Sequence, residues 1–285
     1  MIKRLALAGA VFTMVAGCAT NPYTHRSQLM LLSLSKETEL GNRAYQAIVN
    51  NPSKYHPTAD AATVDAVQRV ADHIISAAQR SRYAETAGRF DWQLTVFDDP
   101  DIENAFALPG GKIGVFTGIF PVARNEAGLA AILGHEVAHA LARHSAERMS
   151  QGLVGEVGLR AADFGLQMFG LGGIVSQAAA GALGIGVQVG VLLPYSRAHE
   201  SEADYIGLLL AAQAGYDPRE AVHVWERMER LAPGTQPSAY VSTHPSHGTR
   251  IAQINAWMPE ALALYHPMTD QPTAELPGLD NRASR

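Results

Sequence analysis

The sequence predicts an α+β protein that is mainly helical and carries one small β-sheet. Several long stretches place apolar residues at the three- and four-residue intervals of an amphipathic helix. One short region alternates apolar and polar residues and contains a Pro-Gly-Gly turn, which is typical of a hairpin. At 285 residues, the chain is long enough to bury a sizeable core within one domain.

The N-terminus has the features of a targeting segment. Lys3 and Arg4 precede an apolar run that is too short to span a bilayer comfortably. The run ends in Val15-Ala16-Gly17-Cys18, which resembles a bacterial lipobox. Cys18 is the only cysteine in the chain and cannot form an internal disulfide. We therefore predict that Cys18 carries lipid and attaches the chain to a membrane.

The residue after the lipobox cysteine indicates a location. It is Ala19 and not the aspartate that often retains lipoproteins in the inner membrane, so we expect anchoring to the outer membrane, facing the periplasm. The polar, proline-containing end of the chain is expected to be a loose tail. The expected organisation is a signal peptide over 1–17, a lipid-anchored tether over 18–34, a main domain over 35–268 and a flexible C-terminal tail over 269–285.

Five helices are predicted from the spacing of apolar residues. In the first, Val64, Val67, Ala71 and Ile74 recur on one face. Gly215 is a plausible stop for the third. The predicted helices span residues 60–80, 127–149, 198–214, 218–231 and 247–257.

A hairpin is predicted between the first and second helices. Trp92, Leu94 and Val96 alternate with polar residues, as in a half-buried strand. Residues 105–108 then meet the turn Pro109-Gly110-Gly111, after which an apolar strand resumes. An exposed edge of this hairpin could pair with an extended substrate through backbone hydrogen bonds.

The stretch from 152 to 193 is rich in small and apolar residues. Its second part, Gly170 to Leu193, carries no charge and meets the length criterion for a membrane span. Glycine and alanine dilute its hydrophobicity, so we prefer a pair of helices with a flexible loop near the cleft, which could act as a lid. A buried helix pair and a membrane-inserted segment are the alternatives.

The motif His135-Glu136-Val137-Ala138-His139 carries the chemistry. Two histidines four positions apart project from one face of a helix, where they can share a Zn²⁺ ion. The adjacent Glu136 can take a proton from the attacking water. The five-residue pattern alone is weak, but it lies within an apolar run that no proline interrupts from 127 to 149.

A catalytic zinc site needs a third protein ligand. His144 lies five positions after His139 and points away from it on a helix, so it does not qualify. Glu200 and Asp204 are four apart on a later helix and share a face. One of the two carboxylates can bind the metal, and the other can accept the free N–H of a ligand histidine. Glu202 lies on a different face.

The chain resembles the zinc metallopeptidase family that includes the CAAX prenyl proteases and HtpX. Within it, the resemblance favours small periplasmic lipoprotein members such as LoiP, and also BepA, although this chain lacks the helical-repeat domain of BepA. The similarity spans roughly residues 35 to 265. Four blocks carry it: Asn104-Ala105-Phe106-Ala107-Leu108-Pro109-Gly110-Gly111, the His135–His139 motif, Glu200-x-x-x-Asp204, and Thr243-His244-Pro245-Ser246-His247 followed by Arg250-Ile251.

The resemblance implies a gluzincin-type metallopeptidase domain and one Zn²⁺ per chain. His135, His139 and Glu200 would be the zinc ligands, Glu136 the general base and Asp204 the partner of a ligand histidine. His244 matches a position that can fill the fourth zinc site and hold the enzyme latent, and His247 could substitute for it. Arg250 matches a family arginine that could steady the oxyanion.

The function expected from the residues and the resemblance is that of a zinc endopeptidase. Its expected substrates are unfolded or misassembled envelope proteins of the bacterial periplasm. The alternative is a chaperone-like assembly factor for outer-membrane proteins, a partner of the assembly machinery, with proteolysis kept latent. The formal net charge of −5 gives no sign of nucleic-acid binding, and basic clusters with interleaved aromatic residues are absent from the sequence.

Overall fold

The computed structural model describes residues 18–154, 195–231, 239–244, 249–268 and 275–277. The chain divides into two compact units, which are described separately. One comprises Met1–Glu37 and Arg143–Leu193, and the other comprises Thr38–Ala142 and Pro194–Arg285. The predicted boundaries after residues 34 and 268 stay predictions.

The unit formed by Met1–Glu37 and Arg143–Leu193 contains a short hairpin. Strands β1 (Cys18–Thr20) and β2 (Ser27–Leu29) pair antiparallel, within a region expected to be a tether. Arg26 holds both carboxylate oxygens of the buried Glu147, at 2.6 and 2.7 Å, and Gln28 donates to the same carboxylate at 3.2 Å. These contacts fix the hairpin to the segment that begins at Arg143.

The larger unit contains a three-stranded sheet and most of the helices. The strand order is β3 (Gln93–Phe97), β5 (Lys112–Phe116), β4 (Ala105–Leu108). β4 and β5 form the predicted antiparallel hairpin, whose turn places Gly110 and Gly111 at φ +85°. β3 pairs parallel with β5. A positive φ is strained for residues with a side chain, which explains the two glycines.

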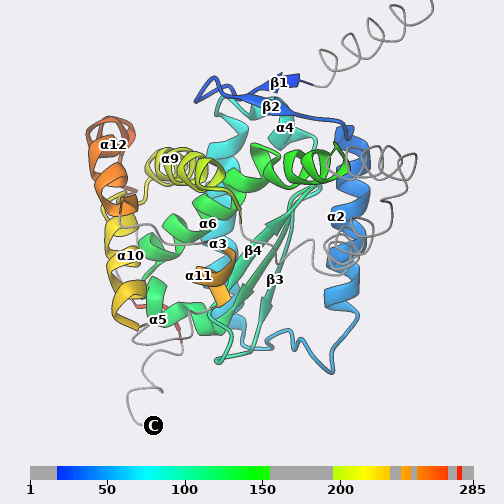
Figure 1. The fold of residues 1–285 in the computed structure, drawn as a ribbon. Helices are drawn as coiled ribbons and strands as arrows, with labels where there is room; N and C mark the ends of the chain where they lie inside the picture. Colours follow the sequence, from blue (N-terminus) through cyan, green and yellow to red (C-terminus); the bar gives the residue numbers. More distant parts are fainter. Residues whose placement is uncertain (1–17, 155–194, 232–238, 245–248, 269–274, 278–285) are drawn as a thin grey trace, which may run out of the picture. The chain divides into compact units, whose positions relative to one another are not determined.

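Helix α6 (Glu126–Leu141) is the centre of this unit. It contacts α3 (Ala61–Gln79), α9 (Arg197–Gln213), α10 (Glu220–Leu231) and strand β4, and Figure 1 shows α6 and α9 running beside each other. Nearly every residue of α6 is buried, so it behaves as a core helix and not as an amphipathic surface helix.

The remaining described elements are short or lie outside this centre. They are α2 (Leu34–Val49), α4 (Ala84–Gly88), the 3₁₀ turn η1 (Thr117–Ile119), α5 (Phe120–Ala123), α11 (Ala239–Thr243) and α12 (Arg250–Leu264). α12 packs on α9 and α10.

Local capping fixes where the site-bearing helices begin. The side chain of Asn125 accepts a hydrogen bond from the backbone N–H of Gly128 at 2.8 Å, and Ser196 accepts one from His199 at 3.2 Å. Such N-caps satisfy N–H groups that have no partner inside the helix. α6 and α9 therefore start at defined residues, which sets the position of each side chain along its helix.

The prediction of a mainly helical α+β protein is confirmed, but three helices differ from it. Helix α2 was not predicted, and α12 continues to Leu264, seven residues beyond the predicted end at 257. The third difference is in the second predicted helix. It was expected to continue to residue 149, but α6 ends at Leu141. Arg143 adopts φ +57°, a left-handed conformation that a continuous helix does not contain, and helical structure resumes at His144. Neither proline nor glycine marks this break in the sequence.

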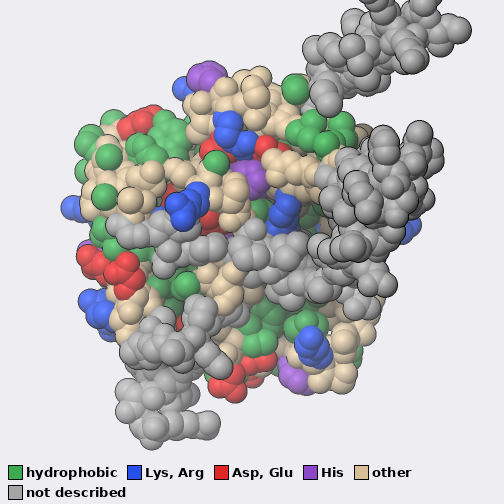
Figure 2. Space-filling model, viewed as in Figure 1, with side chains coloured by type: hydrophobic (Ala, Val, Ile, Leu, Met, Phe, Trp, Pro, Cys, Tyr) green, Lys and Arg blue, Asp and Glu red, His purple; other side chains and the backbone are tan. Residues whose placement is uncertain are grey.

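Two further observations concern the surface. On the face shown in Figure 2, acidic and basic side chains are interspersed among neutral ones. None of the helices within the described residues has both the length and the apolar character needed to cross a membrane. The segment from Gly170 to Leu193, for which a lid, a buried helix pair or membrane insertion was considered, lies outside the described residues.

Candidate active site

Two glycines let the central helices approach closely at the site. A Cβ atom added at Gly207 on α9 would lie 2.6 Å from the backbone nitrogen of His135 on α6. A Cβ atom added at Gly134 would lie 2.7 Å from the carbonyl oxygen of Gly207. Real Cβ atoms do not sit this close to other atoms, so both positions require glycine. The contact brings the His135–His139 face of α6 against the face of α9 that carries Glu200.

Four buried side chains converge between these helices and α11. Each of His135, His139, Glu200 and His244 offers one ligand atom, and these atoms all lie within 4.8 Å of one another. His135 Nε2 lies 3.0 Å from His139 Nε2 and 3.2 Å from His244 Nδ1. Glu200 Oε1 lies 3.1 Å from His244 Nδ1 and 3.5 Å from His139 Nε2.

These separations fit a tetrahedral metal site. With metal–ligand bonds of about 2.0–2.2 Å, the ligand atoms of a tetrahedral zinc site lie roughly 3.3 Å apart. Four of the six separations among the ligand atoms, at 3.0 to 3.5 Å, match that spacing, and all six lie within 4.8 Å. The donor set of imidazoles and one carboxylate is also the one that zinc prefers in catalytic sites. The residues present therefore fit a zinc ion.

Asp204 holds His135 from the side away from this cluster. Its Oδ1 lies 2.9 Å from His135 Nδ1, while His135 Nε2 faces the other ligand atoms. This is the contact that was expected of the second carboxylate on α9. A carboxylate on one ring nitrogen fixes the tautomer and orientation of the imidazole, leaving the other nitrogen to bind a metal.

The charges of the cluster are strongly coupled. Burial lowers the pKa of His135, but hydrogen bonds with Asp204 and Glu200 outweigh burial and raise the pKa to about 9. Burial raises the pKa of Glu200, but hydrogen bonds from His135 and His244 bring it well below its usual range. A bound cation would reverse the preference of His135 for a proton, because a ligating nitrogen must be unprotonated.

Glu136 lies next to the cluster and keeps one oxygen available. Its side chain is buried, and its Oε1 has no hydrogen-bond partner among the described residues. That oxygen lies 3.3 Å from His244 Nε2. The hydroxyl of Tyr240 forms a hydrogen bond with the same carboxylate. A buried carboxylate oxygen without a partner is costly, and it is suited to accept a proton from water.

Arg250 is the most extensively bonded side chain of the site. Its Nε and Nη2 donate to Asp204 at 2.7 and 2.5 Å, and its Nη1 donates to Glu200 at 2.9 Å. Burial lowers the pKa of Arg250, and the charge of Asp204 more than offsets this and raises the pKa above its usual value. The oxyanion role expected of Arg250 stays a prediction. Its hydrogen bonds go to the two carboxylates and, at 3.5 Å, to the backbone carbonyl of His244.

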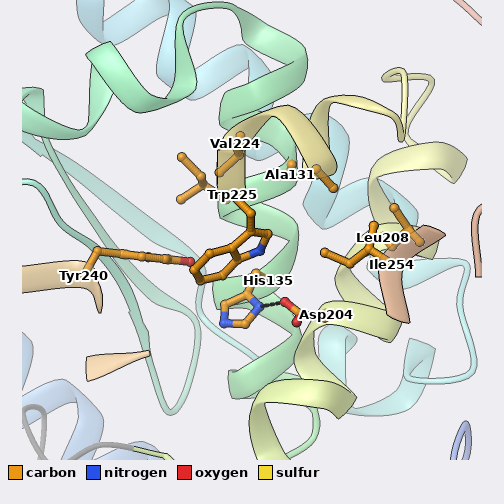
Figure 3. Close-up of a pocket in the computed structure, with 10 residues that line it drawn as sticks. Ala131, His135, Asp204, Leu208, Val224, Trp225, Tyr240 and Ile254 are labelled. Atoms are coloured by element: carbon orange, nitrogen blue, oxygen red, sulfur yellow. Dashed lines mark ion pairs between the residues drawn. The ribbon is translucent and has the colours of Figure 1, made fainter. Parts of the chain in front are cut away.

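A small pocket lies beside His135, and Asp204, Trp225 and Tyr240 all line it. Figure 3 shows Trp225 and Tyr240 reaching toward His135 from one side and the ion pair between His135 and Asp204 on the other. Ile254 and Leu208 line the same pocket. Apolar walls reduce the access of water to the histidine and its carboxylate, which strengthens their electrostatic interaction.

Aromatic residues of the site were missed from the sequence. The ring of Tyr195 lies 4.0 Å from that of His139, centroid to centroid, and the ring of Tyr240 stacks on His244 at 4.6 Å. Trp225 lies over the guanidinium of Arg250 at 3.7 Å. Tyr240 precedes His244 by four positions, and the N–H of His244 donates to the carbonyl of Tyr240 at 2.8 Å. This spacing is the one local signal that could have pointed to a member of this group.

Of the other residues considered, His247 lies outside the described residues, so its role as a substitute for His244 stays a prediction. Cys18 lies in β1 and is exposed, as a modified residue would need to be. His144 is buried in the helix that follows α6.

Comparisons with known proteins give the family and relatives of the chain. Residues 61–258, more than half of the chain, match Peptidase family M48. The mitochondrial metalloendopeptidase OMA1 of Schizosaccharomyces pombe is 40% identical over 250 residues, covering 84% of this chain and 66% of that protein. The mitochondrial metalloendopeptidase OMA1 of Saccharomyces cerevisiae is 32% identical over 273 residues, covering 87% of this chain and 74% of that protein.

A bacterial relative is less similar. The beta-barrel assembly-enhancing protease of Yersinia pestis is 28% identical over 160 residues, covering 52% of this chain and 31% of that protein. The chain thus spans just under two thirds of the fission-yeast protein and less than a third of the bacterial one. The expected closeness to LoiP and BepA is not supported, because the OMA1 proteins match at higher identity over more of the chain.

The same comparison corrects the expected location. A periplasmic protein anchored in the outer membrane was predicted from the N-terminal motif and from resemblance to bacterial lipoproteins. That prediction is wrong, because the relatives that match most of the chain are mitochondrial proteins. The lipobox-like motif is four residues long, so it carries less information than a match over 250 residues.

The predictions of a zinc cofactor and of a metalloendopeptidase are confirmed at the level of the family, whose members are zinc-dependent. All four clustered residues, His135, His139, Glu200 and His244, fall within the matched range 61–258. The chain belongs to peptidase family M48.

Proposed function

We propose that this chain is a zinc endopeptidase in which His135, His139 and Glu200 bind the metal and Glu136 is the general base. The observation that carries the proposal is the convergence of the two α6 imidazoles and the α9 carboxylate, with separations of 3.0 to 3.5 Å, beside a buried glutamate. A structural metal site has no need of a proton acceptor next to its ligands.

Each residue has a defined task in peptide hydrolysis. A zinc ion held at this site supplies Lewis-acid chemistry to the reaction. Glu136 takes a proton from the attacking water on Oε1, which accepts no hydrogen bond from the described residues, and passes it to the leaving amine. Asp204 Oδ1, 2.9 Å from His135 Nδ1, holds the ring so that its Nε2 lone pair is directed at the metal site.

The substrate is proposed to bind as an extended strand along β4. Within the described part of the chain, this strand is at the edge of the sheet and pairs with β5 alone. It packs against α6, which carries the two histidines. Backbone hydrogen bonds to an edge strand give affinity with little preference for sequence. Unfolded or misassembled proteins, whose strands are unpaired, are therefore the proposed substrate class.

Digestion of casein tests the proposal. The purified chain loaded with zinc is compared with Glu136→Gln, which keeps the shape of the side chain and removes the base. Glu229→Gln, at an exposed position of α10, is the matched control. We expect Glu136→Gln to retain one zinc per chain and to lose cleavage, while the control cleaves normally. Cleavage at the normal rate by Glu136→Gln would refute the assigned base.

A second candidate function is favoured by the position of His244. Its Nδ1 completes the group of four ligand atoms and its Nε2 lies 3.3 Å from Glu136. With this side chain in the fourth coordination position of the proposed metal, no position is open for a reacting group. This favours a chaperone-like factor that holds its clients while proteolysis is latent.

Replacement of His244 separates the two candidates. If the enzyme is latent, His244→Ala should digest casein faster than the unmodified chain, because the fourth coordination position becomes open. Lost or unchanged cleavage would show that His244 is not a latch. Suppression of aggregation of an unfolded client by Glu136→Gln, which cannot cleave it, would support the chaperone-like function.

We further propose that the chain attaches to a membrane through lipid on Cys18. This proposal is supported by the lipobox-like motif and by the exposure of Cys18. Cys18→Ser should move the protein from the membrane fraction to the soluble fraction. Unchanged fractionation would argue against a lipid anchor.

A further inference from the structure

We infer that Arg250 is a positioning residue of the metal site, one that holds Glu200 toward the metal and Asp204 toward His135. The inference rests on the proposed function, because it assumes that Glu200 binds the metal. It differs from the oxyanion role, in which the guanidinium would contact the substrate.

The hydrogen bonds of Arg250 define this role. Nε and Nη2 donate in parallel to the two oxygens of Asp204, and Nη1 donates to Oε2 of Glu200. All three guanidinium nitrogens are therefore engaged by the two carboxylates. The side chain is only 3% exposed. A substrate oxyanion would have to compete with these charge-assisted bonds, which are among the strongest hydrogen bonds in proteins.

The two carboxylates need such a partner. Glu200 and Asp204 lie four residues apart on one face of α9, where like charges repel each other. Both are buried, so water does not screen this repulsion. A buried anion is stable only when a cation or several donors face it. Arg250 places one cation between both carboxylates. Because its guanidinium is a rigid fork, it also fixes how the two carboxylates are oriented relative to each other.

Arg250 is itself held in place by three elements. It is the first residue of α12, it binds the carboxylates of α9, and its guanidinium lies 3.7 Å from the ring centroid of Trp225 on α10. The planar guanidinium stacks on an aromatic face, an interaction that a lysine ammonium does not reproduce. The donor is thus oriented before any metal arrives.

Two side chains link Arg250 to the metal cluster, in addition to a longer hydrogen bond from Nη1 to the carbonyl oxygen of His244 at 3.5 Å. One is Glu200, whose Oε2 lies 2.9 Å from Arg250 and 3.5 Å from His135 Nε2. The other is Asp204, which lies 2.9 Å from His135 Nδ1. Loss of the guanidinium should therefore loosen two metal-binding residues together. Loss of residues that orient metal ligands typically weakens metal binding by roughly 10- to 100-fold.

The zinc dissociation constant, measured by competition with a chromophoric chelator, tests the inference. We expect roughly 10- to 100-fold weaker binding for Arg250→Met, which keeps the apolar stem but removes the donors. Arg250→Lys should also weaken binding, because one ammonium cannot replace the forked contact. The lysine variant keeps the charge and serves as a second measurement if the methionine variant does not fold.

Arg227 provides the matched control. It is a largely buried arginine of α10 that binds the backbone carbonyls of Val122 and Ala123 and the side chain of Glu220. Among the described residues, none of these bonding partners belongs to the proposed metal site. Arg227→Met should lower the thermal stability and leave the zinc dissociation constant unchanged. An equal loss of zinc affinity in both variants would overturn the inference, because the effect would then be a general one.

The remaining outcomes are also decisive. An unchanged zinc dissociation constant in Arg250→Met would overturn the inference, and a lower kcat in that zinc-saturated variant would support the oxyanion role instead. If the unmodified chain binds no zinc at all, the proposed function fails before the role of Arg250 is tested. Weaker binding in both Arg250 variants, with the control unchanged, supports the inference.

Discussion

The glycine contact between α6 and α9 gives a prediction whose magnitude follows from the structure. In Gly207→Ala, the new Cβ would lie 2.6 Å from the nitrogen and 2.8 Å from the Cα of His135. Because favourable contacts between such atoms begin at about 3.5 Å, the helices must separate by roughly 0.7–0.9 Å. Metal sites tolerate displacements of about 0.2 Å in ligand distance. The substitution should therefore weaken zinc binding strongly.

The stability of Gly207→Ala should fall as well. Overpacking of a closely packed interior costs about 1–3 kcal/mol, which for a chain of this size lowers Tm by roughly 2–12 °C. The measurements are zinc affinity by chelator competition and thermal unfolding of the metal-free protein. Gly88→Ala on α4 is the control, because a Cβ atom there would meet nothing within 4 Å. If Gly207→Ala bound zinc as tightly as the unmodified chain, the reasoning from close approach would be refuted.

Three further predictions concern stability. Burial raises the pKa of Glu37 from 4.5 to about 7, although Arg143 acts to lower it. The neutral form of Glu37 therefore contributes fully to the stability of the folded state below pH 4.5, and this contribution is lost as the pH rises through 7. The unfolding free energy should thus fall by up to ~1.4 kcal/mol per pH unit in this window, and denaturant titrations should show that Glu37→Gln removes this slope. Asn125→Ala removes the N-cap of α6 and should cost about 1 kcal/mol in the same assay, and an unchanged midpoint would contradict the capping role. Removal of zinc with a chelator should lower Tm, and re-addition of zinc should restore it; a Tm that ignores zinc would contradict binding to the folded state.

The sequence predicted the parts of the fold and site that depend on local spacing. His135 and His139 share a helix face because they are four residues apart, and so do Glu200 and Asp204. The hairpin followed from the turn residues at Gly110 and Gly111. Each of these signals lies within a few residues along the chain, which is why one sequence was sufficient to find it.

Features that depend on long-range contacts were not predictable in this way. Strands β3 and β5 pair in parallel although β4 lies between them in the sequence, and no local pattern encodes this pairing. The contacts of Trp225 and Tyr195 with the site arise from packing between distant segments. Arg250 was found by resemblance, but its carboxylate partners became apparent only from the packing of α12 on α9.

The proposed metal joins residues that are far apart in the chain. His135 and His244 are separated by 109 positions, and the stretch from 143 to 193 falls between the histidines of α6 and Glu200. A shared ion therefore acts as a cross-link, comparable to a disulfide, that closes a long loop. The entropic cost of closure grows slowly, by roughly 0.6 kcal/mol for each doubling of loop length. Related peptidases can accordingly lengthen or shorten the segment between α6 and α9 during evolution at little thermodynamic cost, provided that the two helices still meet at Gly134 and Gly207.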